Sequence, residues 1–356
     1  MRRCVPFAFA LLFAVAAFAE DPVGPAEYLK ILADSKLTYS LDSKPAKQPV
    51  SEMTCERRDE RTRVVAKDGK REVTRWVVAP EVLKLFAEGE TFFQAEEYDK
   101  AAEKYRAGLA VDPDAVLGHY FLGDALLFGN KDAAGALAAY QKGLALDPTM
   151  PSGHLFSSTA YVRLGQPEKA REEIVKALTY YPGYEAVWKI ANASPELWKA
   201  RPVARHRFEP PAGFLGARNR NKVEIFPGSD AQWLGYAVCK AVWANEQRFA
   251  DRHPKGSNWS IEEERACVLN QMFGTFNMTQ SKLEKDGVAK DEKAVYAALP
   301  PLERHLYEVA NANLLDGYIL FEIFGQRCPL GMSMLDEKAI AMVDQYIRRY
   351  VIVPAE

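Results

Sequence analysis

Leu109-Ala110-Val111-Asp112-Pro113 recurs as Leu144-Ala145-Leu146-Asp147-Pro148, and this repeated stretch indicates the architecture. With Pro182, the prolines are 35 and 34 residues apart (148 − 113 and 182 − 148). The residues eight and twelve positions before each proline also correspond: Tyr105, Tyr140 and Ile174, and Ala101, Ala136 and Ala170. A fixed period of this length is typical of a solenoid, in which each unit buries its apolar face only against the next. The sequence therefore predicts three stacked units between residues 82 and 184.

Small residues alternate with large apolar ones within each predicted unit. Two closely packed antiparallel helices need small residues where their backbones meet, and Gly89 and Gly123 meet this need together with the three alanines. Each proline follows a second helix, because proline cannot continue a helix. His119 and His154 occupy equivalent places in two units, and we expect their rings to pack.

The stretch Glu97-Tyr98-Asp99-Lys100-Ala101-Ala102, followed by the Asp-Pro stretch quoted above, resembles the tetratricopeptide repeat. The resemblance covers residues 82–184 of the 356. It implies a mostly α fold: a right-handed α-solenoid of about three helix pairs, whose first helices line a concave groove. Two features depart from the family pattern. The second unit has an extra residue near Gly129-Asn130, and Ser158 stands where the family prefers glycine.

The resemblance also implies which side chains face the groove. Carried over residue by residue, they are Phe86, Glu90, Phe93 and Gln94 in the first unit, Tyr120, Asp124, Leu127 and Phe128 in the second, and Leu155, Thr159 and Arg163 in the third. The lysine and asparagine set with which some family members hold a C-terminal carboxylate is missing. A largely apolar groove suits an amphipathic helix or an extended peptide.

A protein or peptide is therefore the expected partner, without a cofactor. Two alternatives stay open: the chain's own hairpin or C-terminal helices fill the groove, or the repeats serve self-association into a homo-oligomer. The near-neutral net charge of −2 argues against a general nucleic-acid binder.

The amino terminus has the pattern of a cleaved export signal. Arg2 and Arg3 precede an apolar run, which ends at the small-residue motif Ala17-Phe18-Ala19. The run is too short to span a bilayer stably. We expect cleavage after Ala19 and a periplasmic or secreted chain without a membrane span.

Composition and local signals predict five segments. They are a signal peptide (1–19), an accessory segment (20–80), the repeat domain (81–190), a basic proline-rich linker (191–228) and a helical bundle (229–356). Lys67-Asp68-Gly69-Lys70 between extended runs predicts a small β-hairpin in the accessory segment. The linker's arginines favour either a solvated surface or contact with an anionic partner.

The helical bundle offers the alternative function, an enzyme or small-ligand domain whose substrate the repeats recruit. In a helix predicted from Leu302 to Gln326, the polar residues Glu308, Asn311, Tyr318 and Glu322 fall on one face. Glu308 and Glu322 are about 21 Å apart along that helix, too far to act on one bond. The common catalytic motifs are absent from the sequence, so we expect a protein that is not an enzyme.

Four cysteines follow the leader: Cys55, Cys239, Cys267 and Cys328. They allow three pairings in an oxidising compartment. Cys239 and Cys267 fall on consecutive predicted helices and are the favoured pair, while small buried thiols are the alternative. The sequence lacks Cys-x-x-Cys and closely spaced histidines, so no metal site is expected.

Overall fold

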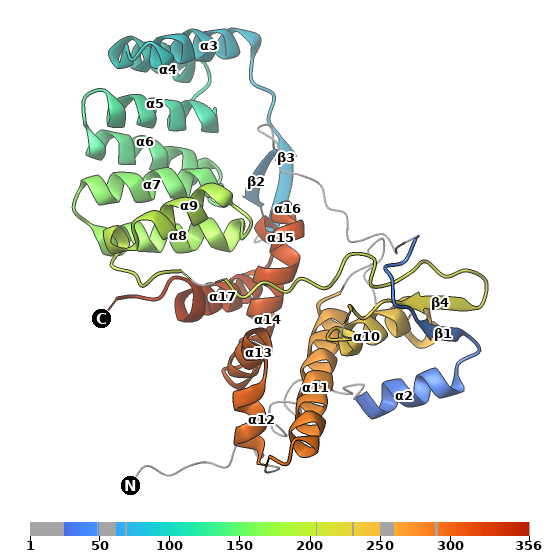
Figure 1. Ribbon diagram of the computed structural model, residues 1–356. Coiled ribbons are helices and arrows are strands. Elements are labelled where there is room, and N and C mark those ends of the chain that lie inside the picture. Colours follow the sequence, from blue (N-terminus) through green and yellow to red (C-terminus); the bar gives the residue numbers. More distant parts are fainter. Residues whose placement is uncertain are drawn as a thin grey trace. The chain divides into compact units, whose positions relative to one another are not determined.

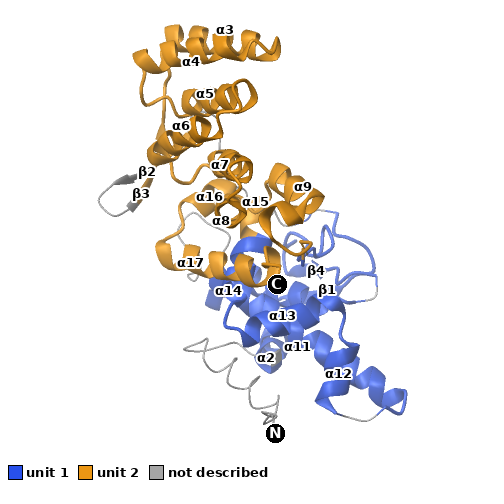
Figure 2. Cartoon of the chain, turned by 90° about the vertical axis from the view of Figure 1, so that its left-hand side faces the viewer, with its two compact units in different colours: residues 1–54, 206–323 blue, residues 55–205, 324–356 orange. Residues whose placement is uncertain are grey.

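The computed structural model describes residues 25–47, 49, 62–67, 70–203, 205–229, 231–249, 260–288 and 291–355. The described chain is mostly helical and divides into two compact units (Figure 2). Unit 1 combines residues 1–54 with 206–323, and unit 2 combines residues 55–205 with 324–356. These bounds differ from the sequence-based ones, because the end of the chain belongs with the repeats. The predicted signal peptide (1–19) and Cys55 lie outside the described residues.

Three helix pairs form the repeats of unit 2, as the sequence predicts (Figure 1). The pairs are α3 (Pro80–Gln94) with α4 (Tyr98–Val111), α5 (Val116–Phe128) with α6 (Ala133–Leu146), and α7 (Pro151–Arg163) with α8 (Pro167–Tyr180). Each helix packs against the helix before it and the helix after it, so the pairs stack in chain order. α9 (Glu185–Ala193) and the 3₁₀ helix η1 (Pro195–Trp198) follow on α8.

Aromatic rings lying on glycines hold the first two pairs together. A Cβ added to Gly89 of α3 would lie 2.4 Å from the ring of Tyr105, and one added to Gly108 of α4 would lie 2.4 Å from the ring of Phe86. The second pair repeats the arrangement, with Tyr140 on Gly123 and Tyr120 on Gly143. Each helix of a pair therefore has a glycine where an aromatic ring of the other helix packs.

The third pair meets the same requirement with smaller side chains. Ser158 takes the glycine position of α7 and faces a helix that has Ile174 in place of the tyrosine. Ala177 similarly takes the glycine position of α8, and Leu155 takes the aromatic position of α7. These two residues, Ser158 and Ile174 are all buried. This exchange explains the departure at Ser158, because a serine fits where the opposing ring is gone.

Side-chain ring nitrogens form hydrogen bonds that fix the turns before α5, α7 and α9. Nε2 of His119 lies 2.8 Å from the carbonyl of Pro113, and Nε2 of His154 lies 2.9 Å from the carbonyl of Pro148. Trp188 Nε1 donates to the third proline carbonyl, that of Pro182, at 2.6 Å. A carbonyl only accepts, so each histidine is protonated at Nε2. The two histidines therefore bond as well as pack.

The predicted hairpin is confirmed as β2 (Thr62–Lys67) and β3 (Lys70–Arg75), with Lys67 opposite Lys70. Its hydrogen bonds run to the turns between repeats. The Val64 N–H donates to Asp147 Oδ2 at 3.0 Å, and Trp76 Nε1, just after the hairpin, donates to Asp112 Oδ2 at 3.2 Å. Asp112 and Asp147 are the aspartates of the repeated Asp-Pro stretch. The hairpin thus fastens onto the turns before the second and third helix pairs.

The last helices of the chain pack on α8. They are α15 (Gly325–Arg327), α16 (Pro329–Ser333), α17 (Glu337–Tyr346) and the π-helical turn η4 (Ile347–Val351). α16, α17 and η4 all contact α8, which buries seven residues, compared with four in α4. This segment covers the last repeat, a protection that a solenoid end requires.

Unit 1 combines a parallel strand pair with helices. Its elements are α2 (Pro25–Asp34), β1 (Thr38–Leu41), β4 (Lys222–Ile225), α10 (Leu234–Asn245), η2 (Gln247–Phe249), α11 (Ile261–Lys285), α12 (Glu292–Ala298), α13 (Pro301–Asn311), α14 (Leu315–Tyr318) and the π-helical turn η3 (Ile319–Phe324). β1 pairs with β4 in parallel, with Tyr39 opposite Val223. β4 comes from the expected linker, which is therefore partly folded. Cys239 and Cys267 form a disulfide between α10 and α11, with Cα atoms 5.2 Å apart.

The long helix expected from Leu302 to Gln326 is wrong, because the chain breaks it at Asn313. Asn313 adopts a left-handed conformation, with φ of 58°, after α13 ends. The Leu314 N–H then bonds the carbonyl of Val309, which closes the helix end. Asparagine tolerates this conformation better than most residues. Every helix in the described ranges is too short or too polar to cross a bilayer.

Candidate functional site: the inner face of the repeats

The structure separates the eleven predicted groove residues into two groups. Four are buried in the repeat core, with at most 6% of each residue exposed: Phe86, Tyr120, Leu127 and Leu155. Their side chains are taken up by packing between helices, as the ring contacts of Phe86 and Tyr120 with glycine show. They therefore position the surface but do not form it. The other seven form the second group and are half-buried or exposed: Glu90, Phe93, Gln94, Asp124, Phe128, Thr159 and Arg163.

Two aromatic side chains give the surface its apolar part. Phe93 near the end of α3 and Phe128 at the end of α5 meet edge to face, with ring centroids 6.1 Å apart. Tyr98 at the start of α4 lies against the other side of this pair, 5.2 Å from Phe93. Phe128 remains 52% exposed. A phenylalanine this exposed contributes little to the fold, so its area is available for binding.

Two carboxylates lie one turn before this aromatic pair, and each accepts a tyrosine hydroxyl. Tyr105 donates to Glu90 Oε1 at 2.6 Å, and Tyr140 donates to Asp124 Oδ1 at 2.6 Å. The bonds join equivalent positions of the first and second helix pairs. In the third pair the acid is replaced by Thr159 and the tyrosine by Ile174, so both partners disappear together.

Burial changes the acid–base behaviour of Asp124. Desolvation raises the pKa of Asp124 to about 6, while the hydrogen bond from Tyr140 lowers it and the negative charge of Glu90 raises it further. The effect of Glu90 shows that the two acids are near enough to interact. Burial and the adjacent carboxylates also raise the pKa values of Tyr105 and Tyr140. Both hydroxyls therefore remain donors at neutral pH.

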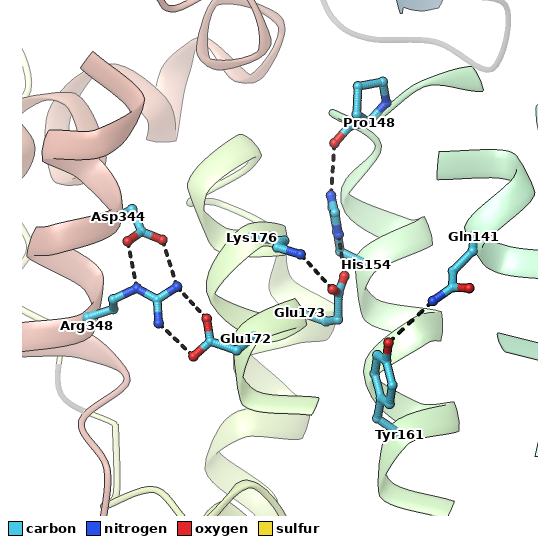
Figure 3. Close-up of polar contacts among 9 residues, drawn as sticks. All are labelled: Gln141, Pro148, His154, Tyr161, Glu172, Glu173, Lys176, Asp344 and Arg348. Atoms are coloured by element: carbon cyan, nitrogen blue, oxygen red, sulfur yellow. Dashed lines mark hydrogen bonds and ion pairs between the residues drawn. The ribbon is translucent and has the colours of Figure 1, made fainter. Parts of the chain in front are cut away.

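A charged network follows in the third pair (Figure 3). His154 Nδ1 lies 2.6 Å from Glu173 Oε2, and Lys176 donates to Glu173 Oε1 at 2.8 Å. The two ring nitrogens of His154 therefore contact the carbonyl of Pro148 and the carboxylate of Glu173. Burial by itself raises the pKa of Glu173, but the bonds and charges of His154 and Lys176 outweigh it, and the pKa is lowered. The network fixes α7 to α8.

The sequence missed a hollow beside the aromatic pair. Its volume is about 400 Å³, and it is lined by Glu96, Glu97, Tyr98, Asp99, Lys100, Gly129 and Asn130. These residues come from the turn between α3 and α4, from the first turn of α4 and from the turn after α5. The extra residue near Gly129-Asn130 was the one local signal, since it lengthens the turn on this side of the second pair.

The polar side chains of unit 1 mainly bond one another. Lys240 pairs with Glu263 at 2.6 Å and with Glu264 at 3.2 Å, and Tyr236 donates to Glu264 at 2.5 Å. Both glutamates are buried, and this pairing accounts for their burial. Glu322, central to the alternative function, is 3% exposed. The part of the chain that the structure describes contains no metal-binding cluster of three or more His, Cys, Asp or Glu.

Several cations of the expected basic linker have partners within their own unit. Arg205 stacks on the indole of Trp188 at 4.2 Å and donates to Gln326 Oε1 at 3.0 Å. Lys199 bonds Glu168 at 2.5 Å, and Lys222 bonds Glu224 at 3.0 Å. The stacking of Arg205 favours a structural role for that residue, whereas Lys199 and Lys222 pair at the exposed surface.

The tetratricopeptide repeat family matches the chain twice, over residues 86–151 and over residues 127–193. No curated protein matches the sequence. Among solved structures, the chain is similar to the first tetratricopeptide repeat domain of Spaghetti (RPAP3) bound to the HSP90 peptide SRMEEVD. That match has 24% identity and a TM-score of 0.30, and it covers 33% of this chain and 93% of that one.

A second similar structure is the CopN–Scc3 complex, with 16% identity and a TM-score of 0.27. It covers 53% of this chain and 94% of that one. Both likenesses concern the fold alone. The family matches and the three observed helix pairs agree on the same segment. Residues 86–193 of this chain are tetratricopeptide repeats.

Proposed function

We propose that this protein is an exported scaffold or adaptor that binds a protein or peptide through the inner face of its repeats. The observation that carries the proposal is the pair Phe93 and Phe128, an apolar contact in which Phe93 is half-buried and Phe128 is 52% exposed. Exposed aromatic side chains on rigid helices lose little entropy on binding and serve as anchors. The two acids beside them, Glu90 and Asp124, supply polar recognition.

The test replaces the anchor, in which Phe93 packs partly against the core and Phe128 is exposed. Phe93 and Phe128 are changed together to alanine, and retention of partners from the native compartment is compared with that of the unchanged protein. Tyr120 is unsuitable, because it is 1% exposed and packs on Gly143. Val111→Ala is the matched control, since Val111 is 50% exposed at the end of α4. Equal partner retention by the anchor variant would refute the proposal.

Export rests on the leader pattern alone and has its own test. The mature protein, isolated from its host, should begin at Glu20 when its amino terminus is sequenced. A mature chain that still carries Arg2 and Arg3 would contradict export through a cleaved leader.

A further inference from the structure

The hollow and the exposed aromatic pair form one continuous surface. Tyr98 belongs to both, because it lines the hollow and its ring contacts Phe93. Phe128 is followed directly by Gly129, which also lines the hollow. We call this surface the acidic–aromatic corner and define it as Phe93, Phe128 and the lining residues of the hollow.

The corner carries a negative charge. Three carboxylates line the hollow, from Glu96, Glu97 and Asp99, against the single ammonium of Lys100. Lys100 is paired with Glu97. Within the described chain, Glu96 and Asp99 have no cation within ion-pair distance. A cationic group of a ligand would therefore meet two carboxylates, those of Glu96 and Asp99, that no cationic side chain pairs with in the described chain.

Backbone dipoles at the corner oppose one another. Tyr98, Asp99 and Lys100 form the first turn of α4, whose N–H groups favour anions, so the negative charge of the corner comes from its side chains. The last carbonyls of α3, which ends at Gln94, and of α5, which ends at Phe128, favour cations. Glu90 and Asp124 lie one helical turn before these ends, on the inner face. The charge therefore extends from the corner along the predicted groove.

We propose that the acidic–aromatic corner binds a lysine or arginine side chain of the partner, with an adjacent apolar residue on Phe93 and Phe128. This inference rests on the proposed function and adds the chemical class of the partner: a peptide segment that is basic and apolar. The cation is attracted by Glu96, Asp99 and the ring face of Tyr98. A peptide that ends in a free carboxylate or carries acids at this point meets repulsion instead.

The test selects peptides without assuming a partner. A library of random 12-residue peptides is displayed on phage and selected on the immobilised chain that begins at Glu20. We expect enrichment of sequences in which lysine or arginine lies next to phenylalanine, tryptophan or leucine. Affinities of the best synthetic peptide are then measured by calorimetry against variants of the full chain.

Two variants separate the parts of the corner. Glu96→Gln with Asp99→Asn should weaken the peptide about tenfold, which corresponds to about 1.4 kcal/mol, and 0.3 M salt should weaken binding to the unchanged chain similarly. Phe128→Ala should weaken it at least as much. Glu103→Gln and Val111→Ala, both at exposed positions of α4 outside the corner, should leave the affinity within twofold.

The outcomes distinguish this inference from the function on which it rests. Selected peptides that are neutral or acidic, and that respond to Phe128→Ala but not to the carboxylate variant, overturn the inference and leave the proposed function standing. Peptides that respond to neither variant overturn both. A selection that enriches no sequence also counts against both.

Discussion

Asp124 is a carboxylate whose surroundings oppose its ionisation. Its folded pKa of about 6 lies above the ordinary value of 3.8, so the folded state holds the proton more tightly than the unfolded chain does. The stability that follows is fully present below about pH 4 and is lost as pH rises through 6. An asparagine in place of Asp124 would accept the hydrogen bond from the Tyr140 hydroxyl equally well and would carry no charge.

We therefore expect Asp124→Asn to flatten the pH dependence of unit 2. Between pH 4 and pH 7 the unfolding free energy of the variant should rise relative to the unchanged protein by about 1–2 kcal/mol. Urea unfolding at a series of pH values measures it. Glu103→Gln, at an exposed helix position, is the control for loss of a charge, and equal slopes for all three proteins would contradict the burial effect.

At Glu173 the dependence of stability on pH has the opposite direction. Its lowered folded pKa means that its ionised form stabilises the protein above about pH 4.5, the ordinary value, and that this stabilisation disappears as pH falls further. Glu173→Gln removes the buried carboxylate that His154 and Lys176 both contact. The variant should lose about 3 kcal/mol at pH 7, and the loss should shrink below pH 4.5.

The same urea titrations test this expectation. Glu172→Gln is the matched control, because Glu172 lies next to Glu173 on α8 but its side chain is 43% exposed and pairs with Arg348 (Figure 3). A surface pair of this kind is worth about 0–1 kcal/mol. Similar losses for the two variants would show that burial of Glu173 is not decisive.

At the scale of elements, the helix pairs follow a rule of complementary size. A ring on one helix requires a glycine on the other, and a serine or alanine is found where the opposing side chain is aliphatic. At Gly123 an added Cβ would lie 2.2 Å from Cε1 of Tyr140, closer than any packed carbon. Gly123→Ala should therefore cost about 2–3 kcal/mol, because Tyr140 has no room to retreat.

A graft from the third pair should relieve the clash. Gly123→Ser, Asp124→Thr and Tyr140→Ile together reproduce Ser158, Thr159 and Ile174. The triple variant should be at least about 1 kcal/mol more stable than the sum of its single changes predicts, since the sites are in contact. Chemical denaturation measures the coupling, with Ala138→Ser at an exposed position of α6 as the control. Strict additivity would refute the size rule.

At the scale of the whole molecule, the chain end completes the repeats by apolar packing. Val343, Tyr346 and Ile347 are 0% exposed, and their helices lie on α8. Arg348 adds a bidentate pair with Glu172 at 2.7 and 2.6 Å and a bond to Asp344. The arginine side chain is 40% exposed, so solvent screens the pair.

Tyr346→Ala should therefore lower the unfolding free energy of unit 2 by about 3–5 kcal/mol, whereas Arg348→Ala should lower it by about 1 kcal/mol or less. Thermal melting followed by circular dichroism ranks the two. The reverse order would mean that charge, not apolar area, holds the end of the chain on the last repeat.

The repeats and the hairpin were predictable because their signals are local and recur. Gly89 with Tyr105, the Asp-Pro stretches and Asp68-Gly69 each predict a contact within one unit or one turn. The break at Asn313 was also local, but Asn has too weak a preference for the left-handed conformation to reveal it. The groove residues stay a prediction. Carrying positions over from a family could not tell that Phe86, Tyr120, Leu127 and Leu155 are buried in the core, because it does not show which of two neighbouring apolar residues the core uses.

The stacking of three helix pairs with a period of 34 and 35 residues could be predicted from the sequence, since each unit contains its own small and large packing residues. The folded structure was needed to show that the strand at Lys222 pairs with the one at Thr38, that the chain end covers α8, and that Tyr98 lines the hollow and contacts Phe93. These contacts join residues far apart in the chain. Which residues meet depends on the complementary shape and the buried apolar area of the folded elements, and a periodic sequence pattern does not predict it.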